Sequence, residues 1–291
     1  DLGPSTKTYI KEASSFNRGN YGGRNFHFGV REHAMGAIIN GMSLSKLRPY
    51  GATFFVFSDY VRPAIRLSSL MKQPVVYIFT HDSIGVGEDG PTHQPVEHLA
   101  SLRAMPGLDV IRPSDANELS VMWKYIMGLK DRPVALVLSR QGMPTLDRSK
   151  YAPADGALKG AYVLIESDGI PDVILIGTGS EMQICLDAYE QLASEGINAR
   201  VVSMPCCSLF QSQDKEYREK VLPRSVKARI VVEAGSTFGW HGYTGREDDC
   251  GIFGLKDFGA SAPAGELYKE FGFTAERVVQ VAKNVIKKNK K

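Results

Sequence analysis

Two short, continuous apolar runs place the strongest constraint on how this chain can fold. Residues 75–80 read VVYIFT and residues 134–139 read VALVLS, and both are rich in β-branched side chains. Neither run alternates apolar with polar residues, so each is typical of a strand that is covered on both faces. The two runs therefore predict central strands of a parallel α/β sheet.

The residues between these runs carry helical periodicity. Apolar residues recur at helical spacing over 95–105 and 115–129. Ser114 stands before the second segment as a predicted N-cap, with Asn117 and Glu118 in the first turn. The predicted order of this part is β-α-β-α-β.

A second α/β series follows residue 140. Residues 141–159 are polar and rich in proline and glycine, which predicts a linker. The later segments predict strands at 173–176, 199–203 and 229–233 and helices at 180–194 and 274–289. We therefore expect an α/β fold of two doubly wound domains, with a mainly parallel sheet in residues 1–140 and a smaller domain in residues 160–291.

Composition excludes several classes of partner. A hydrophobic share of 43% with 23% charged residues is ordinary for a globular protein, and a formal net charge of +3 indicates neither a nucleic-acid nor a membrane partner. The four cysteines lack CxxC spacing, which favours buried thiols in the cytoplasm. The chain begins at Asp1 inside the turn-like stretch DLGPS, without methionine, and we expect it to be part of a longer polypeptide.

The loop after the first apolar run has the composition of a site. Residues 80–95 read THDSIGVGEDGPTHQP and contain His81, Asp82, Glu88, Asp89 and His93. These side chains could be metal ligands, an active-site wall or a capped loop that only ends a strand. The twelve-residue separation of the histidines is not a zinc spacing. Parallel sheets bind ligands outside the carboxyl ends of their strands, which favours a ligand site here.

Glu32 and an aromatic stripe each allow two interpretations. Glu32 starts the small-residue segment 29–41, either as an ordinary helix-start carboxylate or as a group that exchanges a proton with a bound heterocycle. Phe54, Phe57 and Tyr60 recur at helical spacing, which is typical of a core stripe or of a pocket that stacks on a planar ring.

Two further features are less specific. Arg140 follows the second apolar run at the same predicted sheet edge, either to bind a phosphate or as a surface residue without a partner. The turn GTGSE at residues 177–181 has no third glycine in register, so we interpret it as structural. Residues 233–245 are interpreted as a packed turn around a buried Trp240.

Seven segments together resemble the transketolase family of thiamine-diphosphate enzymes. They are DLGPS at 1–5, FGVREHAMG at 28–36, ATFFVFSDY at 52–60, THDSIGVGEDGPTHQP at 80–95, RPSDANE at 112–118, LSRQ at 138–141 and VVSMP at 201–205. The resemblance extends over essentially the whole chain. It implies a pyrimidine-binding domain that lacks its start and a C-terminal domain, with the N-terminal diphosphate-binding domain absent.

The resemblance also implies roles for individual residues. Glu32 resembles the catalytic glutamate that hydrogen-bonds the pyrimidine N1′ of thiamine diphosphate. The other implied cofactor residues are Asp1, Phe54, Phe57 and Tyr60. The residues implied to bind the sugar phosphate are Ser5, His81 and Arg140. The residues implied to contact substrate hydroxyls close to the reacting carbons are Asp89 and His93, and His93 is also expected to be catalytic.

The implied reaction transfers a two-carbon glycolaldehyde unit from a ketose phosphate to an aldose phosphate. In the family, Mg²⁺ or Ca²⁺ and the diphosphate are held by a GDG segment and an asparagine in the N-terminal domain, and nothing in this sequence replaces them. The chain is therefore expected to be inactive alone, and to need that domain from a homodimer partner or a separate subunit.

Three alternatives remain open from the sequence. The chain could be an assembly or dimerisation subunit of a split thiamine-diphosphate enzyme. It could be a formaldehyde-using relative, although Ser5, His81 and Arg140 argue against an unphosphorylated acceptor. It could also be a metal hydrolase built on the loop at 80–95.

Overall fold

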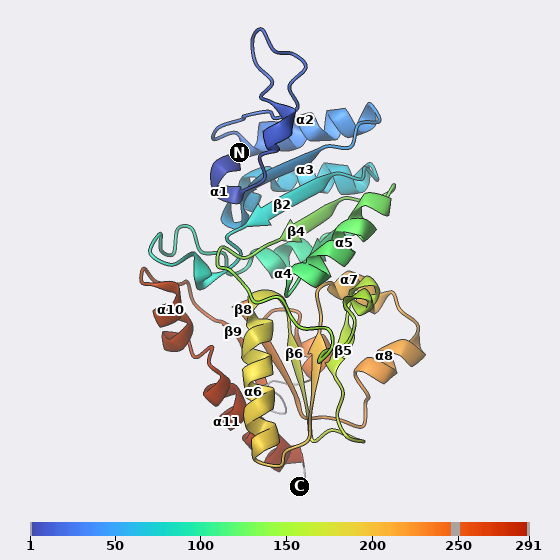
Figure 1. The fold of residues 1–291 in the computed structure, drawn as a ribbon, viewed down its shortest axis with the longest axis vertical. Coiled ribbons are helices and arrows are strands. Elements are labelled where there is room, and N and C mark those ends of the chain that lie inside the picture. The colour runs from blue at the N-terminus through green and yellow to red at the C-terminus, as the bar shows by residue number, and fades with distance from the viewer. Residues whose placement is uncertain (1, 246–250, 290–291) are drawn as a thin grey trace.

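The computed structural model describes residues 2–245 and 251–289, which form two α/β units placed one after the other along the long axis (Figure 1). The predictions that concern Asp1 and Cys250 fall on residues outside those that the structure describes. Within these ranges, none of the helices combines the length and apolar composition of a bilayer-spanning segment.

The first unit is built on four parallel strands in the order β1-β2-β4-β3. Their bounds are β1 Tyr50–Phe54, β2 Val76–Thr80, β3 Asp109–Ile111 and β4 Val134–Val137. The strands β2 and β4 are the two predicted apolar runs. They lie at the centre of the sheet and are buried along their whole length, as the sequence predicted.

Helices cover both faces of this sheet. They are α1 Gly3–Thr6, α2 Glu32–Leu44, α3 Ser58–Leu70, α4 His98–Arg103 and α5 Ala116–Gly128. Tyr77 and Phe79 of β2 pack with residues of α3 and α4, whereas Ile78 packs with residues of α5. Successive strand residues point to opposite faces, so a strand covered by helices on both sides must be apolar throughout.

The small residues of α2 allow it to pack closely on α3. A Cβ atom at Gly36 would lie 2.5 Å from Cγ2 of Val61 and 2.7 Å from Cβ of Ala64. Close helix approach therefore explains the glycine and alanine content of this segment, and it fixes the position of Glu32 at the start of α2.

The predicted N-cap of α5 was wrong by one residue. Asp115 caps the helix, because its Oδ1 accepts a hydrogen bond of 2.8 Å from the Glu118 amide. Glu118 reaches back, and its Oε2 accepts a hydrogen bond of 2.7 Å from the Ser114 amide. The carboxylate of Asp115 also accepts hydrogen bonds from Arg148. Because the carboxylate is charged, these bonds are stronger than those that a neutral serine hydroxyl would accept.

The second unit contains a mixed sheet in the order β5-β7-β6-β8-β9, with β5 antiparallel to β7 and the other pairs parallel. The strands are β5 Tyr162–Ile165, β6 Val173–Gly177, β7 Ala199–Ser203, β8 Arg229–Ser236 and β9 Gly251–Leu255. The helices are α6 Met182–Ser194, α7 Cys207–Gln211, α8 Lys215–Val221, α9 His241–Thr244, α10 Ala264–Glu270 and α11 Ala275–Asn289. In Figure 1, α6 and α11 lie together on one side of this sheet.

The α/β class is confirmed, with a mainly parallel first sheet. The predicted helix at 95–105 is shorter, and a 3₁₀ turn at Gly179–Glu181 precedes α6, which therefore begins two residues later than predicted. The predicted order β-α-β-α-β placed a strand between the two helices, and β3 lies there. The edge strands β1, β5 and β9 were not predicted, because short strands at a sheet edge carry little periodicity. The boundaries 1–140, 141–159 and 160–291 stay a prediction.

Candidate functional site

The carboxyl ends of β1 and β2 bring Phe54 and His81 together. Phe54 ends β1 in register with Thr80, and His81 is the first residue after β2. The two rings stack with their centroids 3.7 Å apart and an interplanar angle of 23°. The predicted edge of the sheet is therefore occupied by one ring from each strand.

Further rings extend this contact into a group of five, which we call the aromatic cluster: Phe54, Phe57, Tyr60, His81 and His93. The Phe57 centroid lies 6.1 Å from Phe54, with the rings nearly parallel, and 5.9 Å from Tyr60. His93 meets Phe57 edge-on at 5.6 Å. Tyr60 is 63% exposed, so the cluster is open to solvent on the side of that ring.

His81 is held in an unusual backbone conformation. Its φ of +64° lies in the left-handed region, which costs a non-glycine residue about 1–3 kcal/mol. Its Nδ1 lies 2.9 Å from the Thr80 hydroxyl oxygen, and its ring stacks on Phe54. Such a conformation persists only where the surrounding structure fixes it, which makes His81 a candidate functional residue.

Charged groups around His81 act on its titration. Burial, followed by the positive charge of Arg140, lowers the pKa of His81 below its usual value, while Asp89 acts in the opposite direction. The neutral imidazole is therefore favoured at neutral pH. Arg140 and Asp89 are both exposed, and a phosphate could reach Arg140 from solvent. The structure thus brings Asp89, His93 and Arg140 within electrostatic reach of His81.

Glu32 is the first residue of α2 and is 5% exposed. Its carboxylate has no hydrogen-bond or ion-pair partner within the described part of the chain. The side chain is largely covered, but its carboxylate oxygens reach the surface, where a bound group could donate a hydrogen bond to them. This donor chemistry fits a nitrogen heterocycle of the kind that the sequence predicted.

The glycines of the loop allow it to pack closely against the second unit. Gly87 and Gly90 have φ of +86° and +77°, and a Cβ at Gly90 would lie 3.3 Å from Cβ of Ser261. The Gln94 side-chain amide donates to the carbonyls of Gly87, at 2.9 Å, and Ala260, at 2.8 Å. In Figure 1 the loop after β2 lies beside α10. The second unit therefore forms one side of the loop.

Two predicted residues are not joined to this cluster. Ser5 is exposed on α1, and among the described residues its side chain makes no hydrogen bond to the loop at 80–95. Asp1 lies outside the described residues. Their assignment to the site stays a prediction.

The loop histidines and carboxylates do not gather as a set of metal ligands. In residues 2–245 and 251–289, the group that comes within ligand distance is Asp59, Glu97 and His98. Those residues lie at the starts of α3 and α4 and outside the predicted site. The described residues thus offer no ligand set for a hydrolase built on this loop.

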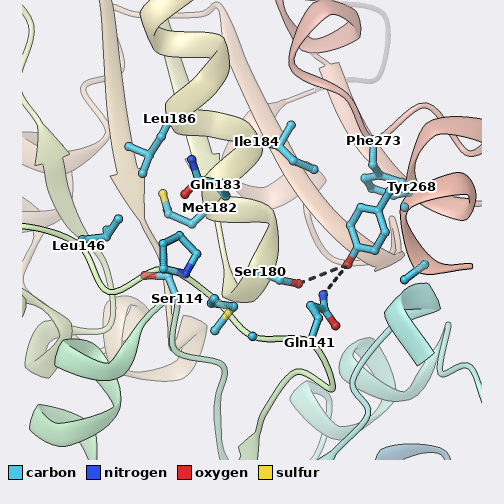
Figure 2. Close-up of a pocket in the computed structure, with 15 residues that line it drawn as sticks. Ser114, Gln141, Leu146, Ser180, Met182, Gln183, Ile184, Leu186, Tyr268 and Phe273 are labelled. Atoms are coloured by element: carbon cyan, nitrogen blue, oxygen red, sulfur yellow. Dashed lines mark hydrogen bonds between the residues drawn. The ribbon is translucent and has the colours of Figure 1, made fainter. Parts of the chain in front are cut away.

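Two cavities of interest lie away from the aromatic cluster. One of about 700 Å³ is enclosed by residues 2–29, α2 and β1, and its lining does not include Glu32, Phe54 or His81. The other, of about 410 Å³, lies between residues 141–146, α6 and α10 (Figure 2). The aromatic cluster lines neither of them and is open to solvent at Tyr60.

Sequence reasoning missed the buried polar residues beneath the loop. Arg112 is fully buried and pairs with Asp82 and Glu181, and Tyr268 of α10 donates to Glu181. The one available signal was an arginine directly after the apolar residues of β3, where a surface position is not expected.

Comparisons with known proteins agree over the whole chain. A family model described as "Transketolase, pyrimidine binding domain" matches residues 1–145, and one described as "Transketolase-like TK C-terminal domain" matches residues 160–274. The transketolase of Halalkalibacterium halodurans is 55% identical over 287 residues, which are 98% of this chain and 43% of the relative. The chain thus spans less than half the length of that relative.

Solved structures show the same likeness. Transketolase from Leishmania mexicana superposes with a TM-score of 0.93 at 43% identity, over 99% of this chain and 42% of that one. Transketolase from Pichia stipitis in complex with sedoheptulose 7-phosphate also reaches a TM-score of 0.93, at 42% identity, over 100% of this chain and 42% of that one.

Proposed function

This chain belongs to the transketolase family, and we propose on that basis that it supplies the pyrimidine-binding side of a thiamine-diphosphate site. At this site a two-carbon glycolaldehyde unit would pass from a ketose phosphate to an aldose phosphate. The observation that carries the proposal is the contact of Phe54 with His81 and of Phe57 with His93. Rings assigned to the cofactor and imidazoles assigned to the substrate belong to one cluster.

Glu32 is the proposed catalytic carboxyl group. Its buried side chain, without a partner among the described residues, would hydrogen-bond the pyrimidine nitrogen and hold a proton there. Phe54, Phe57 and Tyr60 would stack around the planar ring. When bound, thiamine diphosphate acts as the electron sink for cleavage of the carbon–carbon bond.

The loop is the proposed substrate wall. His81 and Arg140, with Ser5, would bind the sugar phosphate, and Asp89 and His93 would contact hydroxyls near the reacting carbons. His93 would also take part in proton transfer. The transketolase of Pichia stipitis was solved in complex with sedoheptulose 7-phosphate, which supports a sugar phosphate as the substrate class. The positive charge of Arg140 near His81 favours a phosphorylated acceptor over formaldehyde.

A second set of residues would complete the site. The exposed side of Tyr60 leaves room for another domain against the aromatic cluster. We place the diphosphate, and the Mg²⁺ or Ca²⁺ that accompanies it, on the diphosphate-binding domain of a homodimer partner or separate subunit, with Asp1 near the cofactor. The chain alone would then be inactive. Its buried free thiols, Cys185, Cys206 and Cys207, support a cytoplasmic location.

Reconstitution tests this proposal. The chain is combined with a transketolase diphosphate-binding domain, and transfer between a ketose phosphate and an aldose phosphate is measured with and without thiamine diphosphate. Transfer is expected only with both the domain and the cofactor. Phe57→Ala should weaken cofactor binding, whereas Phe238→Ala, at a 75% exposed ring in the second unit, should not. Absence of transfer from the complete assembly would overturn the proposal.

A further inference from the structure

A buried cluster joins the two units directly beneath the loop at 80–95. We call Asp82, Arg112, Glu181 and Tyr268 the interdomain cluster. Arg112 is fully buried, and its Nε and Nη2 contact Oδ2 of Asp82 at 2.9 and 2.8 Å. Its Nη1 pairs with Oε2 of Glu181 and donates to the Thr178 carbonyl at 2.9 Å. One guanidinium therefore holds a residue of each unit.

Glu181 is satisfied through both carboxylate oxygens. Its Oε1 accepts from the Tyr268 hydroxyl at 2.7 Å and from the Ser180 hydroxyl at 2.8 Å. Its Oε2 accepts from the Ala234 amide at 3.0 Å, besides Arg112. These donors come from different elements of the second unit, so Glu181 has a fixed position against which Arg112 is held.

The cluster reaches the loop at two adjacent residues. Asp82 follows His81 in the chain, and Ser83 Oγ lies 3.1 Å from the Tyr268 hydroxyl oxygen. Because the Tyr268 proton goes to Glu181, the single Ser83 hydroxyl proton is shared between the Tyr268 oxygen and Oδ1 of Asp82 at 3.2 Å, and Ser83 Oγ accepts from the Gly85 amide at 3.2 Å. The residues that follow His81 are thus tied to α10 and Glu181, while the His81 ring is tied to Phe54.

We propose that Arg112, Glu181 and Tyr268 are positioning residues that hold His81 in its left-handed conformation through Asp82 and Ser83. The second unit would thereby set the position of the imidazole that meets the sugar phosphate. The role of His81 toward a sugar phosphate rests on the proposed function, but the positioning of His81 does not. A φ of +64° at His81 needs such external support, because an unconstrained histidine would leave that region.

Tyr268 is the most informative position to change. Its hydroxyl also lies 3.2 Å from Ser180 Oγ and 3.4 Å from the Gln141 side-chain amide (Figure 2). The ring lines the cavity of about 410 Å³, and Tyr268→Phe removes the hydroxyl while leaving the ring in place. Glu181→Gln keeps the shape of the second positioning residue and removes its charge.

A spectroscopic measurement on the full chain tests the inference without any assay of activity. The ring signals of the six histidines are observed by NMR, and that of His81 is assigned from His81→Gln. The Phe54 ring at 3.7 Å makes the His81 signal sensitive to small movements. Tyr268→Phe and Glu181→Gln should each move this signal more than that of any other histidine.

Tyr125→Phe is the matched control. It removes a tyrosine hydroxyl that donates to another buried carboxylate, that of Asp109, at 2.9 Å. The control should leave the His81 signal in place. If Tyr268→Phe and Glu181→Gln leave it in place as well, or if Tyr125→Phe moves it equally, the inference is wrong. Arg112→Lys is a third variant, and its failure to fold would leave the other two decisive.

Kinetics of the reconstituted enzyme give a second readout. Tyr268→Phe should raise KM for a phosphorylated ketose about tenfold, which is the loss expected when one charged hydrogen bond is misplaced. It should leave kcat, and KM for an unphosphorylated ketose, nearly unchanged. An equal rise in KM for the phosphorylated and the unphosphorylated ketose would contradict the inference. A wild-type assembly without transfer would overturn the proposed function, whereas the NMR result would still decide the positioning of His81.

Discussion

Glu32 and Glu181 are both buried glutamates, and the difference between their surroundings separates two kinds of polar site in this chain. Glu181 accepts hydrogen bonds through both oxygens and pairs with Arg112, whereas Glu32 has no partner for its carboxylate among the described residues. A saturated buried carboxylate stabilises the fold or holds its neighbours. The Glu32 side chain is largely covered, but its carboxylate oxygens reach the surface and have no partner among the described residues, which leaves them open to a ligand.

A similar contrast separates the aromatic cluster from the interdomain cluster. The aromatic cluster near β1 and β2 is open at Tyr60, and Asp89 and Arg140, whose charges act on His81, are exposed. The interdomain cluster is closed, and Asp82 and Arg112 are almost wholly buried. The aromatic cluster is therefore accessible to other molecules, whereas the interdomain cluster is closed to them.

The largest expected effect is on turnover, when Glu32 is replaced. Glu32→Ala should lower kcat of the reconstituted enzyme by about 10²- to 10⁴-fold, because a positioned acid or base contributes that much. It should leave the free energy of unfolding nearly unchanged, because no partner loses a contact. Rate assays and denaturant unfolding measure both, with the exposed Glu216→Ala as the control. Unchanged turnover would remove the contrast with Glu181.

The next effect is on the free energy of unfolding, when the interdomain cluster is changed. Glu181→Ala should lower the free energy of unfolding by about 3–5 kcal/mol, because Arg112 would be left buried and only partly paired. Glu181→Gln should cost less, since it keeps hydrogen-bonding groups in place. Denaturant unfolding of both variants is the measurement. A cost for Glu181→Ala no larger than that for Glu32→Ala would show that the two carboxylates do not differ.

A smaller effect concerns the helix that carries Glu32. Gly36→Ala should destabilise the fold by about 1–3 kcal/mol, because the added Cβ would overlap Val61 and Ala64 of α3. Gly41→Ala, on the same helix with open space around its Cα, should instead stabilise by about 0.5–1 kcal/mol. Thermal unfolding compares the pair. Equal effects at the two positions would argue against close packing of α2 on α3.

The smallest effect is on the pKa of His81. His81 should titrate below its usual pKa, because burial and the positive charge of Arg140 both disfavour the imidazolium form. Arg140→Gln removes a positive charge and should raise the pKa of His81, whereas Asp89→Asn removes a negative charge and should lower it. NMR titration of the ring signal measures each direction. A pKa that stays the same in both variants would show that these side chains do not act on His81.

Much of the aromatic cluster could be predicted from the sequence. Phe54, Phe57, Tyr60, His81 and His93 stand in two local segments, and the rule that ligands bind at the carboxyl ends of parallel strands placed those segments together. Less of the interdomain cluster could be predicted from the sequence. Asp82 was noticed as a member of the loop, but nothing near Glu181 or Tyr268 in the sequence indicates that they meet it.

The sequence by itself determined the α/β class, the central strands β2 and β4 and the existence of a polar loop after β2, because periodicity and composition act over a few residues. The tertiary structure alone decided that Arg112 joins Asp82 to Glu181, that α10 lies against the loop, and that the Glu32 side chain is largely covered while its carboxylate has no partner among the described residues. These facts depend on contacts between residues far apart in the chain, and such contacts exist only once both sheets have formed and their buried polar groups have been paired or left unpaired.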